Sequence, residues 1–325
     1  MLTGKLPGEL LKELLQDTST NENVIAGPKI GLDAAKIKTC GKNLVVGSDP
    51  ITFTAENIGK YCVYINANDI AVSGAIPKYF MATILLPPKI NEQEAKEIFN
   101  QVNSTCKEMN IALIGGHTEI TDSVTRPIIS GTMFGEEFIN LIPANAKIGA
   151  DIILVNKPAI EGTSILAFNG KDKLLKSGIS QEKIDFALNL LNTQGICILS
   201  VVKELLKYKD SIYYMHDPTE GGIASALTEM SIAINKGIKI DEIEFMDETK
   251  EFCQILKLDP FGLISSGTLI AVTDNGNYIV NKLTNKGFYA KVIGKVTDEI
   301  PKVIYKGEKI KTFSRDEIAR YFEEN

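Results

Sequence analysis

The stretch NANDIAVSGAIP at residues 66–77, followed by YFMATILL at residues 79–86, decides the fold. Apolar residues recur at a helical spacing over residues 57–71, which predicts a helix there. Residues 79–86 form a strand-like run bounded by Pro77 and Pro87. The segment therefore predicts a helix followed by a strand.

Helix-like and strand-like stretches alternate on both sides of this segment, which predicts an α/β (α+β) fold. Asn91, with Glu94 three residues later, predicts a capping box for a helix that continues to Met109. Further strands are expected at residues 43–49, 111–114, 127–134, 151–155, 212–215, 268–272, 289–294 and 303–305. Further helices are expected at 7–15, 181–192, 198–207, 222–235 and 277–285, and after a capping box at Ser314 and Glu317.

The chain becomes turn-like at PANAKIG, residues 143–149, between two predicted strands. We place a domain boundary there, which gives an N-terminal domain of residues 1–145 and a C-terminal domain of residues 146–325. Two domains also agree with a chain of 325 residues, at about 150 residues per domain. Each half carries a Gly-Gly pair after a strand, so we expect two lobes with a cleft between them.

Charge and composition exclude several classes of protein. The chain has 35 Lys plus Arg against 41 Asp plus Glu, and its only arginines are Arg126, Arg315 and Arg320. Nucleic-acid binding is therefore not expected, nor is recognition of phosphate by arginine forks. The two histidines, His117 and His216, are too few for a metal site made of several histidines.

Cysteine usage and hydropathy indicate the cellular compartment. The five cysteines are widely spaced and include no CxxC pair, which argues against a disulfide framework or a zinc ribbon. No apolar run reaches the roughly 18 residues that a membrane span needs. The sequence therefore predicts a cytoplasmic protein without a membrane segment.

Acidic and amide side chains recur near predicted strand ends in the N-terminal half. Asp33 lies in a small-residue loop, Asp49 ends a strand before Pro50, and Glu119 is expected just past another strand. Asn66 and Asp69 are three residues apart, which puts both on one face of a helix. Taken singly, each is more often a cap, a turn residue or a solvated charge. Brought together, such carboxylates suit Mg²⁺.

The pair Gly115-Gly116 is followed by His117 and Thr118. After a strand, these residues can offer backbone N–H groups and a hydroxyl to an anion. The sequence is neither a Walker A loop nor a GxGxxG fingerprint, and on its own a tight turn is the simpler interpretation.

A polar motif, HDPTEGG, stands directly before a predicted helix in the C-terminal half. It consists of His216, Asp217, Pro218, Thr219, Glu220, Gly221 and Gly222. His216 and Asp217 are candidates for a general acid or base and its partner, and the glycines at a helix start are a candidate anion site. The alternative is a helix cap beside a buried histidine. Ser265, Ser266 and Gly267 form a second candidate nest for phosphate or substrate, or a simple polar turn.

The order of these motifs resembles the aminoimidazole ribonucleotide (AIR) synthase superfamily over nearly the whole chain. The resemblance implies an AIR synthase-like two-domain fold and a homodimer whose N-terminal sheets join into a barrel. It also implies ATP with Mg²⁺ in the N-terminal domain. On this basis we expect Asp33, Asn66, Gly115, Gly116, His117 and Thr118 to bind ATP, and Asp49, Asp69 and Glu119 to hold the metal.

Details such as Asp217-Pro218-Thr219 and Asp259-Pro260 are similar to the branch of the hydrogenase-maturation protein HypE. That branch uses a C-terminal cysteine, and the last cysteine of this sequence is Cys253, so we do not carry the HypE reaction over. The resemblance implies transfer of the γ-phosphoryl group of ATP to a carbonyl or amide oxygen of a small molecule, or of a carbamoyl or acyl group. The acceptor is expected near His216 and Asp217.

Two other functions stay open at this point. One is a nucleotide-binding regulatory protein or maturation scaffold without turnover, which would bind a maturation-protein partner. The other is a small-molecule kinase. Arg126 either reaches the nucleotide or is a surface charge at the start of a strand.

Overall fold

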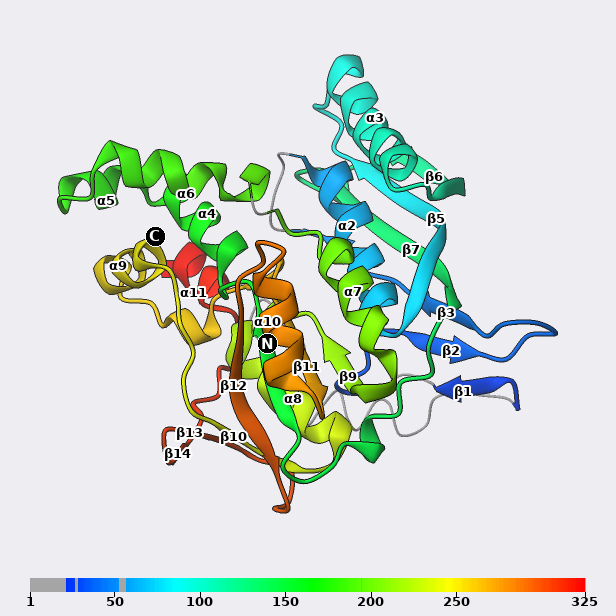
Figure 1. The fold of residues 1–325 in the computed structure, drawn as a ribbon. Helices are drawn as coiled ribbons and strands as arrows, with labels where there is room; N and C mark the ends of the chain where they lie inside the picture. The colour runs from blue at the N-terminus through cyan, green and yellow to red at the C-terminus, as the bar shows by residue number, and fades with distance from the viewer. Residues whose placement is uncertain (1–21, 27–28, 53–56, 194, 325) are drawn as a thin grey trace. The chain divides into compact units, whose positions relative to one another are not determined.

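The computed structural model describes residues 22–26, 29–52, 57–193 and 195–324. The helix expected at residues 7–15 lies outside these residues. Two compact units are present: residues 22–26 and Leu32–Asn140 form the first, and Lys29–Gly31 and Leu141–Asn325 form the second. Each unit is built on a mixed β-sheet with helices (Figure 1), which confirms the predicted α+β class.

The N-terminal sheet has the strand order β1-β2-β3-β7-β5-β6, with β4 paired to β7. Neighbouring strands are antiparallel except β5 and β6, which are parallel. The strands are β1 (Val24–Ala26), β2 (Ala35–Ile37), β3 (Leu44–Gly47), β4 (Pro50–Ile51), β5 (Ala75–Leu86), β6 (Ala112–Ile120) and β7 (Ile128–Glu137). The helices are α2 (Ile58–Val72) and α3 (Glu92–Glu108).

Glycines on β7 let helix α2 lie close to the sheet. A Cβ on Gly131 would stand 2.5 Å from Asn66 Nδ2, and one on Gly135 would stand 2.3 Å from Ile70 Cγ2. Almost every residue of α2 is buried as a result. Helix α3 then packs on α2, and its capping box at Asn91 and Glu94 is confirmed.

The C-terminal sheet has the strand order β14-β13-β10-β12-β8-β11-β9. Its strands are β8 (Asp151–Val155), β9 (Ile212–His216), β10 (Gly237–Ile240), β11 (Leu269–Thr273), β12 (Ala290–Thr297), β13 (Val303–Tyr305) and β14 (Glu308–Lys309). Strands β8 and β11 are buried at every position, as expected for central strands covered on both faces.

Eight α-helices are described in the C-terminal unit, and the polar motifs lie at the ends of several of them. They are α4 (Ile160–Asn169), α5 (Lys171–Lys176), α6 (Gln181–Thr193), α7 (Leu199–Leu205), α8 (Gly222–Ile234), α9 (Asp247–Leu256), α10 (Gly276–Thr284) and α11 (Glu317–Glu324). Short 3₁₀ turns are η1 (Pro143–Asn145), η2 (Leu206–Ser211) and η3 (Pro260–Gly262). Their apolar faces form one continuous core with the sheet.

Some expected elements were wrong or missed. Pro77 lies inside β5 instead of bounding it, and the register with β7 shifts between Pro77 and Tyr79. Such irregularities are where a strand accommodates proline. Helices α4, α5 and α9 and strands β1, β4, β10 and β14 were not predicted from the sequence. Helix α4 has only 10 residues and most of them are buried, and the periodicity of a short apolar run does not distinguish a helix from a strand.

Candidate functional site

The side-chain amide of Asn66 holds the backbone at Asp49. Asn66 is fully buried in α2. Its Oδ1 accepts from Asp49 N at 2.9 Å, and its Nδ2 donates to Asp49 O at 3.1 Å and to Cys62 O at 2.8 Å. The two bonds to Asp49 fix the turn between β3 and β4, so Asn66 acts by positioning Asp49.

Two further carboxylate residues lie beside the same turn. A Cβ on Gly47, the last residue of β3, would stand 3.4 Å from the backbone O of Asp33 and 3.6 Å from Asp69 Cβ. Asp69 is only 6% exposed. The fold therefore places the backbone of Asp33, the turn at Asp49 and the Cβ of Asp69 around Gly47, and carboxylate oxygens are ligands that fit Mg²⁺.

The predicted turn at Gly115-Gly116 is wrong, because both glycines lie inside strand β6. Gly116 has φ +144°, and a Cβ there would stand 2.0 Å from the backbone O of Ala82 on β5. The glycine thus allows close approach of two parallel strands. His117, Thr118 and Glu119 follow within the same strand, so Glu119 is not past its end.

Strand order separates Glu119 from the other acidic residues. Strand β6 is three strands away from β3 in the sheet, which is roughly 14 Å at about 4.8 Å per strand spacing. Glu119 and the turn at Asp49 therefore do not lie on neighbouring strands of the sheet. Its Oε2 lies 3.4 Å from His117 Nε2, and both side chains are exposed.

Strand β6 is an edge strand with an exposed surface. Every residue from Gly115 to Ile120 is exposed, and the large apolar side chains Ile114 and Ile120 are 55% and 65% exposed. Long apolar edge strands are usually covered by another chain or blunted by charge.

In the C-terminal unit, His216 ends strand β9 and is buried with Asp217. His216 Nε2 lies 2.9 Å from Glu229 Oε2 of helix α8. Glu229 was not identified from the sequence, because its contact with His216 depends on how α8 packs on β9. The contact fixes the orientation of the imidazole ring, a side chain that can act as a general acid or base.

The amides at the start of α8 are already occupied. Gly221 N donates to Asp316 Oδ2 at 2.7 Å, and Gly222 N donates to Thr219 O at 3.1 Å. A Cβ on Gly222 would stand 2.6 Å from Phe261 O. The glycines therefore serve close packing, and Asp316 occupies the place where an anion was predicted. Burial raises the pKa of Asp316 to about 7, although it accepts backbone bonds.

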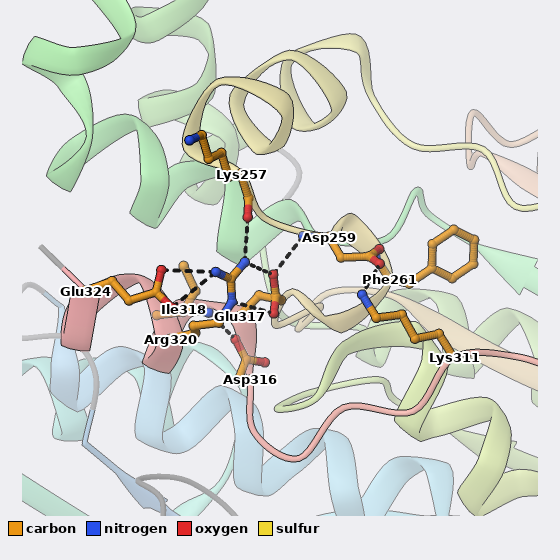
Figure 2. Close-up of polar contacts among 9 residues, drawn as sticks. All are labelled: Lys257, Asp259, Phe261, Lys311, Asp316, Glu317, Ile318, Arg320 and Glu324. Atoms are coloured by element: carbon orange, nitrogen blue, oxygen red, sulfur yellow. Dashed lines mark hydrogen bonds and ion pairs between the residues drawn. The ribbon is translucent and has the colours of Figure 1, made fainter.

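The C-terminal helix is tied to the loop that precedes η3 (Figure 2). Arg320 donates to both oxygens of Glu317 and to Lys257 O. Glu317 Oε2 also accepts from Asp259 N at 2.7 Å. The cap of α11 is Asp316, which accepts from Ile318 N, so the expected capping box at Ser314 is wrong.

The loop of Ser265, Ser266 and Gly267 meets two other segments of the C-terminal unit. Ala159 N donates to Ser265 Oγ at 3.0 Å, and Ser265 N donates to Thr219 O at 3.2 Å. Gly267 has φ +94°, and its carbonyl accepts from Asn156. The start of α4, the residues before α8 and this loop therefore form one cluster, which includes Thr219, Gly221 and Gly222.

Glu161, in the first turn of α4, belongs to the same cluster and was missed. Its side chain hydrogen-bonds with Ser266. Its Oε2 is buried and has no hydrogen-bond partner among the residues that the structure describes. Burial raises the pKa of Glu161 above its usual range. A glutamate after NKPAI gives no sequence signal, because α4 itself was not predicted.

The remaining candidates are simpler. Arg126 is exposed in the loop before β7. Cys62 is fully buried, as expected for a core cysteine, and burial raises its pKa as well as those of Cys106 and Cys253. These three thiols are poor nucleophiles.

Among the described residues, no helix has the length and apolar character needed to cross a bilayer.

Comparisons with known proteins show the family of the chain and the proteins that share its fold. Two family models match the chain: "AIR synthase related protein, N-terminal domain" over residues 31–136, and "AIR synthase related protein, C-terminal domain" over residues 147–306. A putative hydrogenase expression/formation protein of Methanocaldococcus jannaschii is 31% identical over 280 residues, covering 82% of this chain and 79% of that protein. The carbamoyl dehydratase HypE of Rhizobium leguminosarum bv. viciae is 25% identical over 276 residues, covering 83% and 75%.

Solved structures share the fold. A HypE–HypF complex superposes with a TM-score of 0.73 at 20% identity, covering 95% of this chain and 100% of that chain. The hydrogenase maturation protein HypE in complex with ATP superposes with a TM-score of 0.70 at 20% identity, covering 89% and 90%.

Proposed function

The chain belongs to the AIR synthase-related family, and on this premise we propose that it is an ATP- and Mg²⁺-dependent enzyme. It transfers the γ-phosphoryl group of ATP to a carbonyl or amide oxygen of an acceptor. The observation that carries the proposal is the turn that Asn66 fixes at Asp49, with Asp33 and Asp69 beside it. The HypE relative that was solved with ATP supports it.

In the N-terminal domain, Asp49 and Asp69 would hold Mg²⁺, and Asp33 would lie beside the nucleotide. When bound, the metal neutralises charge on the phosphates. Asn66 holds the Asp49 backbone in one conformation through two hydrogen bonds, so Asp49 needs little further ordering when the ligand binds. Positioning of this kind supplies much of the catalysis in phosphoryl transfer.

In the C-terminal domain, His216 and Asp217 would act on the acceptor. The His216 ring can hold or release a proton at Nε2, where it meets Glu229 at 2.9 Å. Thr219, Glu220, Ser265 and Ser266 would line the acceptor site, while Gly221, Gly222 and Gly267 permit the close packing of its segments. This assignment keeps the predicted residues and changes the role of the glycines.

The products of the reaction test the proposal against its two alternatives. Purified protein is incubated with ATP and Mg²⁺ and a panel of small amides, carbamates and alcohols, and the products are followed by ³¹P NMR. We expect ADP and inorganic phosphate in the presence of one amide or carbamate. A stable phosphorylated product would instead identify a kinase, and ATP binding without any turnover would favour a scaffold.

The edge strand β6 supports a homodimer. Pairing two copies along β6 would cover Ile114 and Ile120 and would bring Gly115, Gly116, His117, Thr118 and Glu119 to a site on the partner subunit. Such pairing explains how Glu119 can serve a nucleotide site although it lies three strands from Asp49 in its own chain.

Substituting Ile120→Lys is expected to convert the dimer into a monomer, because it places a charge in the apolar edge contact. The mass in solution, measured by light scattering after size exclusion, checks this. Ile300→Lys is the matched control, since Ile300 is also exposed but lies outside β6. A dimer that persists in the Ile120 variant would argue against pairing through β6.

A maturation-protein partner is also proposed, since a HypE structure was solved in complex with HypF. The acceptor group would then come from that partner or from a small molecule. The cytoplasmic location stays a prediction.

A further inference from the structure

Glu161 has a hydrogen-bonding environment that its local structure does not explain. Its carboxyl group is buried, and only one of the two oxygens is engaged, by Ser266. Buried polar atoms are nearly always hydrogen-bonded, and each exception calls for an explanation. The other oxygen, Oε2, therefore points to a missing partner.

Glu317 shows what a purely structural glutamate looks like in the same domain. It is also buried, but its oxygens accept from Asp259 N and from Arg320. The nearest lysine along the chain from Glu161, Lys157, pairs with Glu244 instead. The carboxyl group of Glu161 is therefore buried, while its Oε2 has no hydrogen-bond partner among the described residues.

The position of Glu161 connects it with the proposed acceptor site. It stands in the first turn of α4, where Ala159 N binds Ser265 Oγ and Gly162 N donates to Ile264 O at 3.2 Å. Its partner Ser266 follows Ser265, whose backbone N binds Thr219 O at 3.2 Å. Glu161 therefore belongs to the same three segments that carry Thr219 and Ser265.

We propose that Glu161 contacts the acceptor directly and that Oε2 hydrogen-bonds to an uncharged amide-type head group, a C=O beside an N–H. This inference rests on the proposed function, which supplies the acceptor. Ser266 is the positioning residue, because its hydroxyl fixes the orientation of the carboxyl group.

The chemistry of a buried carboxyl group favours this class of ligand. Burial disfavours the charged form of Glu161, and a neutral carboxyl offers one O–H donor and acceptor lone pairs. An amide presents a C=O that can accept the O–H of a neutral carboxyl at Oε2 and an N–H that can donate to Oε2, so either group completes the hydrogen bonding of this oxygen. The carbonyl oxygen keeps a second lone pair for phosphorus. An anionic head group would require an uncompensated buried charge.

Infrared difference spectroscopy tests the proposal on the whole protein, with acetamide as the probe and acetate as its anionic counterpart. The difference spectrum between the wild type and Glu161→Gln is expected to show a C=O band of a protonated carboxylic acid that only the wild type has. Acetamide should shift that band, and acetate should leave it unchanged. No such band, or a band insensitive to acetamide, would overturn the proposal.

Glu317→Gln is the matched control, because it makes the same change at the buried glutamate that is fully hydrogen-bonded. It is expected to lower the melting temperature and to leave the acetamide shift intact. Glu161→Gln is expected to keep its melting temperature and to raise the KM for the amide acceptor at least tenfold, with the KM for ATP unchanged. A fall in melting temperature matching that of Glu317→Gln, with an unchanged acceptor KM, would identify a structural role instead.

Failure of this inference is distinguishable from failure of the proposed function. If Glu161 has only a structural role, the wild type still binds ATP with Mg²⁺. If the wild type binds no ATP, the proposed function fails whatever the infrared band does.

Discussion

Gly116→Ala is expected to destabilise the protein by about 3 kcal/mol or more. A Cβ at this position would stand 2.0 Å from the backbone O of Ala82 and 2.9 Å from its carbonyl carbon. Neither atom belongs to a flexible side chain, so strands β5 and β6 would have to separate. The backbone angle φ of +144° adds strain for any residue with a Cβ.

The neighbouring glycine provides a matched control for this prediction. A Cβ on Gly115 would meet only Met81 Cε, at 3.7 Å, which is ordinary contact. Urea unfolding of Gly115→Ala should therefore resemble the wild type within about 1 kcal/mol. Equal stabilities for the two variants would contradict the strand that the structure shows at Gly115 and Gly116.

Asp69→Asn is expected to weaken the binding of ATP in the presence of Mg²⁺ by at least tenfold, or about 1.4 kcal/mol. The substitution keeps the size of the side chain and removes the charge that a hard divalent cation needs. Asp69 is buried beside Gly47 in the same turn region as Asp49, so solvent cannot readily replace the lost ligand. The affinity is measured by isothermal titration calorimetry.

Asp122→Asn is the control for the change of net charge, because Asp122 is an exposed residue of the same domain. Its affinity for ATP should equal that of the wild type. If Asp69→Asn also binds ATP as the wild type does, Asp69 is not a metal ligand.

Much of the fold follows from local signals that tertiary packing does not override. The capping box at Asn91 and Glu94 was predictable because both bonds close within four residues. Helix α2 was predictable from its apolar spacing, and strands β8 and β11 from continuous apolar runs. Each of these signals is read from consecutive residues.

The failures share a different physical origin. The pair Gly115-Gly116 predicts a turn from the local sequence, but Gly116 is needed because the parallel neighbour β5 approaches it closely. Pro77 reads as a strand boundary, but an irregularity in the register accommodates it. In both cases the deciding contact comes from a residue distant in the sequence.

In the candidate site, too, local motifs were predictable and contacts between distant residues were not. The motifs identified most of the residues that gather around Gly47 and before α8. They could not show that Asn66 binds the backbone of Asp49, that Glu229 meets His216, or that Asp316 occupies the amide of Gly221. Glu161 was not predicted, because nothing near it in the sequence indicates a buried carboxyl group.

The most direct test of the central claim, an ATP site that depends on Mg²⁺, is calorimetric titration of the wild-type protein with ATP. The titration is run once with Mg²⁺ and once with excess EDTA. The account predicts saturable binding with Mg²⁺ and an affinity at least tenfold lower without it. Binding of equal strength in both solutions, or no binding in either, would contradict it.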